Sequence, residues 1–266
     1  MTYRYGGTAG NALDGITTTV RRGQFTAVIG PNGSGKSTLA RHMNALLLPS
    51  SGTVTVDGMD TAKPGNIPEI RRRVGFVFQN PDNQLVRTTL EEDIAFGPEN
   101  LCRDPASIRD AVDFALEATG LGELAGRPPH MLSGGQKQLL AIAGALAMKT
   151  GCLILDEPTS MLGPSGRRSV MNIVRRLKKD LEMTVVLVTH LMEEAVLADR
   201  VLVLHRGRVA AEGTPAEVFR SRSPIPGIGL ELPGPVELAG RLRQYGVELP
   251  DPVLTVDELV ACLCRL

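Results

Sequence analysis

Tryptophan is absent from this 266-residue chain, and aromatic residues make up only 3% of it. So few rings argue against a platform on which nucleic-acid bases stack. The chain also lacks an excess of charge of either sign, since Lys and Arg total 29 and Asp and Glu total 29. A nucleic-acid binder needs a basic face, because much of its affinity comes from counterion release. We therefore expect no nucleic-acid partner.

Cysteine is scarce, and the four that occur are Cys102, Cys152, Cys262 and Cys264. No two of them have CxxC spacing, and no histidine lies at metal-ligand spacing from them. This pattern predicts reduced, structural thiols in a reducing compartment.

Long apolar runs are missing as well. No stretch approaches the roughly 18 apolar residues that span a bilayer. Residues 1–10 are polar and glycine-rich, without the apolar core of a signal peptide. If the protein works at a membrane, we expect another subunit to hold it there.

What the chain does contain is an alternation of short apolar runs with helical patterns, which predicts a parallel α/β sheet covered by helices. A helix is expected at 36–47, after the first strand. Residues 81–130 lack strand signals and carry helical patterns, notably at 108–119, so they indicate a helical insertion. The expected strands are 25–29, 53–57, 74–78, 152–155, 184–189, and a hairpin of 201–204 and 208–211 around Gly207.

The domain organisation follows from composition. Residues 221–235 are rich in proline and glycine and are expected to form a linker. We therefore expect one large domain at 1–220, with a helical subdomain inserted at about 80–145, and an appendage at 221–266.

Two short helices are expected in that appendage. Leu238, Leu242 and Tyr245 share one face of the first helix. The second helix begins at Thr255, and Glu258 three residues later completes a capping box.

The segment 30–37 reads Gly-Pro-Asn-Gly-Ser-Gly-Lys-Ser and fits the P-loop pattern between an apolar strand and a helix. Its glycines let backbone N–H groups curl around phosphates, and the helix N-terminus adds its dipole. Lys36 would pair with the β- and γ-phosphates, and the Ser37 hydroxyl would bind Mg²⁺. The alternative is a glycine-rich turn that binds nothing. The candidate ATP-binding residues are Gly30, Pro31, Asn32, Gly33, Ser34, Gly35, Lys36, Ser37 and Thr38.

Two carboxylates, Asp156 and Glu157, follow the apolar run 152–155. A buried strand that ends in acids is how a Mg²⁺ site is built beside a P-loop. Asp156 would hold Mg²⁺ through water, and Glu157 would orient and deprotonate the attacking water. Alone, the pattern would suit a solvated strand end; beside a P-loop it favours the metal site.

Residues 132–136 read Leu-Ser-Gly-Gly-Gln at the start of a helix that is expected to run to 147. This is a second anion-binding helix N-terminus. Two phosphate-binding helix N-termini are unusual in a monomer. The second is therefore expected to contact the nucleotide that is bound by a partner chain. Its candidate ATP-binding residues are Ser133, Gly134, Gly135 and Gln136.

The motifs at 30–37, 132–136 and 152–157, in this order and spacing, resemble those of ABC ATPases. The resemblance implies a head-to-tail dimer in which two ATP molecules lie between the P-loop of one chain and the LSGGQ of the other. It implies that Gln79 contacts Mg²⁺ and water, that His190 contacts the γ-phosphate, and that Tyr5 stacks on adenine. Catalysis would then rest on Glu157, His190 and Gln79, and Mg²⁺ binding on Ser37, Gln79 and Asp156.

A narrower resemblance lies in 78–85, 91–100, 136–138 and 141–148 and in the terminal helices, which are similar to energy-coupling factor (ECF) transporter ATPases. Residues 40–49 and 254–259 look like the first of that group's two ATPase types. The resemblance implies a dimer, usually with a different sister ATPase, held together in part by the C-terminal helices. It also implies a transmembrane coupling (T) subunit and a substrate-binding membrane (S) subunit, with this chain peripheral at the cytoplasmic face.

Three departures from the family pattern stand out. Gly163 occupies the position of an interface Asp, and Leu139 that of an Arg. The chain begins close before Tyr5, so either the first strand is short or the start lies upstream. The loss of the Asp is expected to slow hydrolysis or to make the two ATP sites unequal.

The expected function is therefore ATP hydrolysis, with ATP and Mg²⁺, coupled to uptake of a vitamin or metal ion. One alternative is a chain that mainly binds ATP as a regulatory half of the dimer. Another is the ATPase of a binding-protein-dependent importer or of a non-transport system. The substrate is not encoded here, because in this architecture the ATPase does not touch it.

Overall fold

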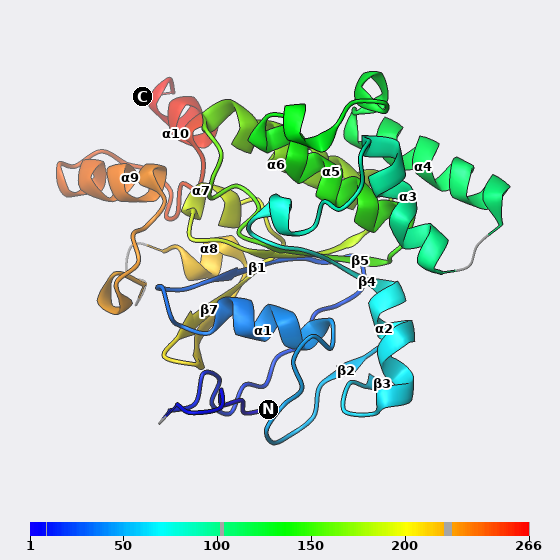
Figure 1. Cartoon of the computed structure of the whole chain (residues 1–266). Helices are drawn as coiled ribbons and strands as arrows, with labels where there is room; N and C mark the ends of the chain where they lie inside the picture. Colours follow the sequence, from blue (N-terminus) through cyan, green and yellow to red (C-terminus); the bar gives the residue numbers. More distant parts are fainter. Residues whose placement is uncertain (9, 102–103, 221–224, 266) are drawn as a thin grey trace.

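A computed structural model describes residues 1–8, 10–101, 104–220 and 225–265 (Figure 1). Cys102 lies outside these residues. The strands are β1 (Phe25–Ile29), β2 (Thr55–Val56), β3 (Met59–Asp60), β4 (Val74–Val77), β5 (Cys152–Asp156), β6 (Thr184–Val188), β7 (Arg200–His205) and β8 (Arg208–Gly213). The α-helices are α1 (Lys36–Met43), α2 (Ile67–Arg73), α3 (Leu90–Asn100), α4 (Pro105–Thr119), α5 (Gly134–Ala147), α6 (Pro164–Asp180), α7 (Met192–Ala195), α8 (Pro215–Val218), α9 (Gly234–Gln244) and α10 (Val256–Leu263).

The main sheet has six strands in the order β4-β5-β6-β1-β7-β8. Neighbouring strands are parallel except for β7 and β8, which form the antiparallel hairpin expected around Gly207. Strands β1 and β6 are buried along their whole length, which explains why they read as unbroken apolar runs. The predicted α/β fold with a parallel-rich sheet is confirmed.

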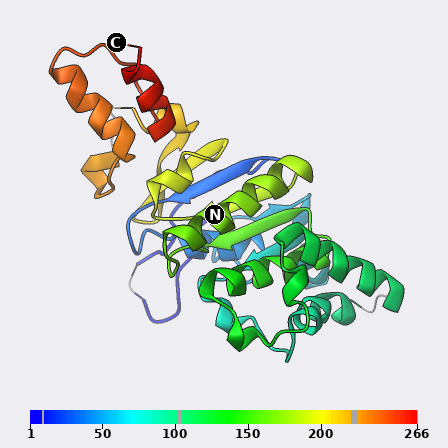
Figure 2. The ribbon, with the colours of Figure 1, turned by 90° about the horizontal axis from the view of Figure 1, so that it is seen from above.

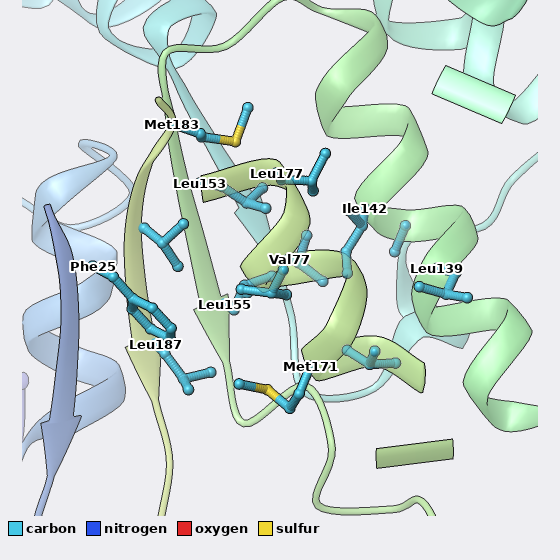
Figure 3. Packing of buried hydrophobic residues seen from close by; sticks show 14 of the residues in the cluster. Phe25, Val77, Leu139, Ile142, Leu153, Leu155, Met171, Leu177, Met183 and Leu187 are labelled. Atoms are coloured by element: carbon cyan, nitrogen blue, oxygen red, sulfur yellow. The ribbon is translucent and has the colours of Figure 1, made fainter. Parts of the chain in front are cut away.

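Helices cover both faces of this sheet. In Figure 1, α1 lies below the sheet, and α5 and α6 lie above it. The alternation along β5 shows the two cores: Leu153 and Leu155 belong to the cluster shared with α5 and α6, whereas Ile154 belongs to the cluster shared with α1. Figure 3 shows the larger cluster, in which Phe25 and Leu187 of the sheet lie opposite the helices.

Two expected elements are shorter than predicted. Helix α1 ends at Met43, because Asn44 turns its side-chain amide to the carbonyl oxygen of Val74 and Ala45 takes a positive φ of 53°. The expected strand 53–57 narrows to β2, which pairs with β3 in a separate two-stranded sheet. Strand β3 was not predicted, since it holds only two residues.

The C-terminal helices lie at the opposite end of the molecule from α3 and α4 (Figure 2). The segment expected to be a linker is partly anchored, because Ile225 is fully buried in the larger core and Val236 of α9 joins it. The predicted capping box of α10 is present. On the face predicted for α9, Leu238 is 47% exposed and Tyr245, at the C-cap, is 88% exposed, whereas Leu242 is half-buried. Among the described residues no helix is long and apolar enough to cross a membrane.

Candidate active site

The site lies where four neighbouring strands end. Strands β4, β5, β6 and β1 are adjacent and parallel, so the residues that follow them emerge at one edge of the sheet. Gln79 follows β4, Glu157 follows β5 and His190 follows β6. The P-loop, 30–37, follows β1 and leads into α1. The strand order therefore brings together loops that are far apart in the sequence.

The P-loop is shaped by close backbone packing. Gly35 has φ +102°, and a Cβ there would lie 2.6 Å from the Ala12 carbonyl oxygen. Lys36 lies across the loop, since its Nζ donates to the carbonyl oxygens of Gly30 at 2.8 Å and Pro31 at 3.1 Å. Burial lowers the pKa of Lys36, and the nearby carboxylates oppose this shift. The Oγ of Ser34 is buried without a partner in the described protein. A loop of this shape fits phosphate oxygens.

A hydroxyl and a carboxylate meet beside the P-loop. Ser37 Oγ donates to Asp156 Oδ1 at 2.8 Å, although the two residues are 119 positions apart. Burial raises the pKa of Asp156, while the Ser37 hydrogen bond and the positive charge of Arg41 lower it. Both groups are hard oxygen donors, which Mg²⁺ prefers. The pair therefore fits a Mg²⁺ ion.

Two side chains approach one carboxylate oxygen of Glu157. Gln79 Nε2 donates to Glu157 Oε2 at 3.1 Å, and His190 Nδ1 lies 3.5 Å from the same oxygen. Glu157 has φ +50°, and its backbone N–H donates to the Val188 carbonyl at 2.9 Å. A non-glycine residue in the left-handed region is uncommon. Gln79 also donates to Ser160 Oγ at 3.3 Å, a residue that the sequence motifs did not single out.

Tyr5 lies beside the start of α1. Its hydroxyl is 3.1 Å from Thr38 Oγ1, and its ring packs edge-on against Tyr3 with centroids 4.9 Å apart. The N-terminal segment forms single bridges rather than a strand, from Thr2 to Ser51 and from Tyr3 to Leu13. Tyr5 is half-buried, so part of its ring is exposed next to the P-loop helix.

The LSGGQ motif begins α5, on the sheet face opposite α1 (Figure 1). Ser133 Oγ accepts from the Gln136 N–H at 3.3 Å, and Gln136 Oε1 accepts from the Ser133 N–H at 2.9 Å, which forms a capping box. A Cβ on Gly134 would lie 3.2 Å from Leu162, and one on Gly135 would lie 3.5 Å from Gly166. The motif therefore packs against the segment that follows Glu157 and begins α6, not against the P-loop helix.

The two positions predicted to depart from the family pattern differ in their surroundings. Gly163 is the N-cap of α6, and a Cβ there would meet nothing within 4 Å. Leu139 is 6% exposed and belongs to the larger core, where it packs as an ordinary apolar residue.

The sequence motifs did not point to Thr159, Thr189 or Glu194. The hydroxyls of Thr159 and Thr189 both donate to the Glu194 carboxylate, close to the site. The chain carries two glutamates in succession, Glu193 and Glu194, and only the second is buried. Sequence alone does not separate them, since both fit the same short helix.

The described cysteines Cys152, Cys262 and Cys264 are free thiols. Burial raises the pKa of the Cys152 thiol to about 12. Such a thiol is inert near neutral pH, in keeping with a structural role.

Residues 13–160 match the family described as "ABC transporter". Among solved structures, cbiO1 from Clostridium perfringens, described as part of the ABC transporter complex cbiONQ, has a TM-score of 0.78 at 39% identity, covering 91% of this chain and 96% of that one. The ATP-binding cassette MJ0796, in a dimeric post-hydrolysis state with ADP and Pi, has a TM-score of 0.71 at 31% identity, covering 80% of this chain and 95% of that one. The chain belongs to the ABC transporter ATPase family.

Sequence relatives narrow the class. The chain is 60% identical to the Energy-coupling factor transporter ATP-binding protein EcfA1 of Symbiobacterium thermophilum, over 96% of this chain and 89% of the relative. It is 51% identical to EcfA1 of Clostridium perfringens (strain 13), over 96% and 91%, and 48% identical to EcfA2 of S. thermophilum, over 96% and 89%. Within the family it is an ECF transporter ATP-binding protein of the first type, as predicted. It is thus an ATP-hydrolysing enzyme that uses ATP and Mg²⁺.

Proposed function

We propose that this chain couples ATP hydrolysis to the uptake of a vitamin or metal ion by an ECF importer. The observation that carries the proposal is the convergence of Gln79, Glu157 and His190 beside the Ser37–Asp156 pair. A carboxylate, an amide and an imidazole that meet at one point suit an attacking water, and the P-loop next to them suits the phosphates of ATP.

In the reaction, the water oxygen bonds to the γ-phosphorus while the bond to the bridging oxygen of ADP breaks. Glu157 orients the water and accepts its proton, and His190 contacts the γ-phosphate. Lys36 balances the charge that develops on the phosphates. Ser37, Asp156 and Gln79 would hold Mg²⁺, which when bound neutralises charge on the phosphate oxygens. Backbone N–H groups of the P-loop cradle the phosphates, and Tyr5 stacks on adenine.

The ATP-binding site at each P-loop is completed by residues of a second chain. Support comes from the position of LSGGQ, which begins a helix on the sheet face opposite α1. Its Ser133 and the amides of α5 would then contact the γ-phosphate bound by the partner. The dimeric state of the similar cassette MJ0796 agrees with this arrangement.

The appendage at 221–266 contributes to the dimer interface. Its helices expose an apolar set that a lone chain would leave in water. The exposed members are Leu238, Tyr245, Val256, Val260 and Leu263. The partner would be a sister ATPase or a second copy, and the pair would sit at the cytoplasmic face of the membrane on a T subunit, with an S subunit binding the substrate.

The catalytic assignment is tested with Glu157→Gln, which keeps the shape of the side chain and removes its basicity. In the assembled transporter, hydrolysis should fall about 10²- to 10⁴-fold, because that is the usual contribution of a general base. ATP binding should persist. The matched control is Glu193→Gln, an exposed carboxylate on α7 that belongs to none of the nucleotide motifs. Unchanged steady hydrolysis in Glu157→Gln would refute the role of Glu157.

A second function is favoured by Gly163, where the interface carboxylate of the family is absent. In that case the chain mainly binds ATP and regulates its partner. Gly163→Asp should then raise the turnover of the complex, whereas little gain would mean that Gly163 is not limiting.

The transport assignment is tested by affinity purification of the tagged chain from its native membranes in mild detergent. Recovery of a second ATPase, a polytopic subunit and small membrane proteins would support the ECF assembly. Recovery of a conventional permease pair would replace it with a binding-protein importer, and recovery of no membrane protein would refute the transport role.

A further inference from the structure

A buried carboxylate that belongs to none of the nucleotide motifs lies behind the site. Glu194, on the short helix α7, is 5% exposed. Its Oε2 accepts from the Thr189 hydroxyl at 2.7 Å, and its Oε1 accepts from the Thr159 hydroxyl. Thr159 and Thr189 are themselves 1% and 2% exposed, so water does not compete for these bonds. A buried carboxylate is costly unless hydrogen-bonded, and here each oxygen has its own donor.

The two threonines belong to the two loops that carry the reacting groups. Thr159 comes two residues after Glu157, and Thr189 comes directly before His190. Thr189 Oγ1 also accepts from the Leu191 N–H at 3.0 Å, so the turn around His190 is held on both sides. The Thr159 carbonyl accepts from the Leu162 N–H at 3.0 Å. The Glu194 side chain is thus hydrogen-bonded to both loops on their buried side.

The exposed side of the same loops is held more loosely. There Glu157 and His190 are 3.5 Å apart, beyond a normal hydrogen bond, and the His190 side chain is 45% exposed. On that side Gln79 Nε2 donates to Glu157 and Ser160, which both belong to the first of the two loops. The Glu157 N–H bond to the Val188 carbonyl joins the backbones of the two loops, and the bonds to Glu194 are the buried side-chain link between them.

We propose that Glu194 is a positioning residue for ATP hydrolysis, which sets the placement of Glu157 relative to His190 through Thr159 and Thr189. The inference rests on the roles proposed above for Glu157 and His190. It predicts a selective loss of turnover, because misplacing reacting groups by about 1 Å can cost about 10²-fold in rate. ATP binding depends on the P-loop, which these bonds do not touch.

The experiment compares Glu194→Gln with Glu193→Gln, its exposed neighbour on the same helix. Gln has one acceptor oxygen in place of two, so one of the threonine hydroxyls loses its acceptor. In the assembled complex we expect kcat for ATP to fall about ten- to a hundredfold in Glu194→Gln. KM for ATP, ATP binding by the full chain and the thermal midpoint should stay close to those of Glu193→Gln.

A second set of variants keeps the test valid if Glu194→Gln unfolds. Thr159→Val and Thr189→Val remove the hydroxyls with little change in shape, whereas Thr159→Ser and Thr189→Ser retain them. We expect kcat to fall in the valine variants and to recover in the serine variants. Adding Glu194→Gln to the double valine variant should cause little further loss, since the contact is already broken.

Equal kcat in Glu194→Gln and Glu193→Gln would overturn the proposal. The proposal would also be overturned if kcat fell only in step with the thermal midpoint and the serine variants did not restore kcat. Glu194 would then contribute to stability alone. Unchanged hydrolysis in Glu157→Gln would instead refute the role of Glu157 as the general base, which the Glu194 variants do not test.

Discussion

Replacement of Gly35 by alanine should damage the P-loop far more than replacement of Gly33. Gly35 has φ +102°, and its Cβ would lie 2.6 Å from the Ala12 carbonyl oxygen and 2.7 Å from Leu13 Cδ2. Leu13 is fully buried, so it has no room to move aside. The backbone strain costs about 1–3 kcal/mol, and the forced overlap in a packed region costs about 1–3 kcal/mol more. Gly35→Ala should therefore lose about 2–6 kcal/mol of unfolding free energy.

Gly33 provides the matched control in the same loop. Its φ is +76°, but a Cβ there would meet nothing within 4 Å. Alanine at this position should cost only the backbone term, about 1–2 kcal/mol. Urea unfolding, followed by circular dichroism with the slope checked for constancy, gives both values. Equal losses in Gly33→Ala and Gly35→Ala would refute the reasoning, because the contact with Ala12 and Leu13 would then carry no cost.

Four further predictions follow from single contacts. Gly163→Asp should raise the unfolding free energy by a few tenths of a kcal/mol, since an Asp N-cap can accept hydrogen bonds from free N–H groups of α6. A lower unfolding free energy in urea would show that the Asp side chain does not fit at this position. Thr255→Ala should lower the stability of α10 by about 1 kcal/mol through loss of its capping box, seen as faster amide exchange in that helix alone. Alkylation at pH 8, mapped by mass spectrometry, should modify exposed Cys264 well before Cys152, because a pKa of about 12 leaves very little Cys152 thiolate; rapid labelling of Cys152 would show that the thiol is not desolvated. Tyr5→Phe should keep the ATP affinity of the unchanged protein, whereas Tyr5→Ala should lose about 1–3 kcal/mol of binding free energy, as expected for a lost stacking ring. Equal ATP affinities of Tyr5→Ala and Tyr5→Phe in a titration would show that Tyr5 does not stack.

Much of the site could be predicted from local patterns. The P-loop and the Asp156–Glu157 pair depend on residues that are close together in the sequence, so their spacing is visible without a structure. Elements with long patterns were also predictable, because apolar periodicity over many residues is a strong signal. Short elements were not: β3 has two residues, and the end of α1 depends on a bond from Asn44 to Val74, 30 positions away.

The sequence by itself determined the family, the P-loop pattern at 30–37 and the pair of acids, since each is encoded by neighbouring residues. Only the tertiary structure decided which of two successive glutamates is buried, and that Glu194 lies between Thr159 and Thr189. It also decided that Gln79 and His190 reach the same oxygen of Glu157. The physical reason is the order of the strands: parallel neighbours deliver their carboxyl ends to one edge of the sheet, whatever their separation along the chain.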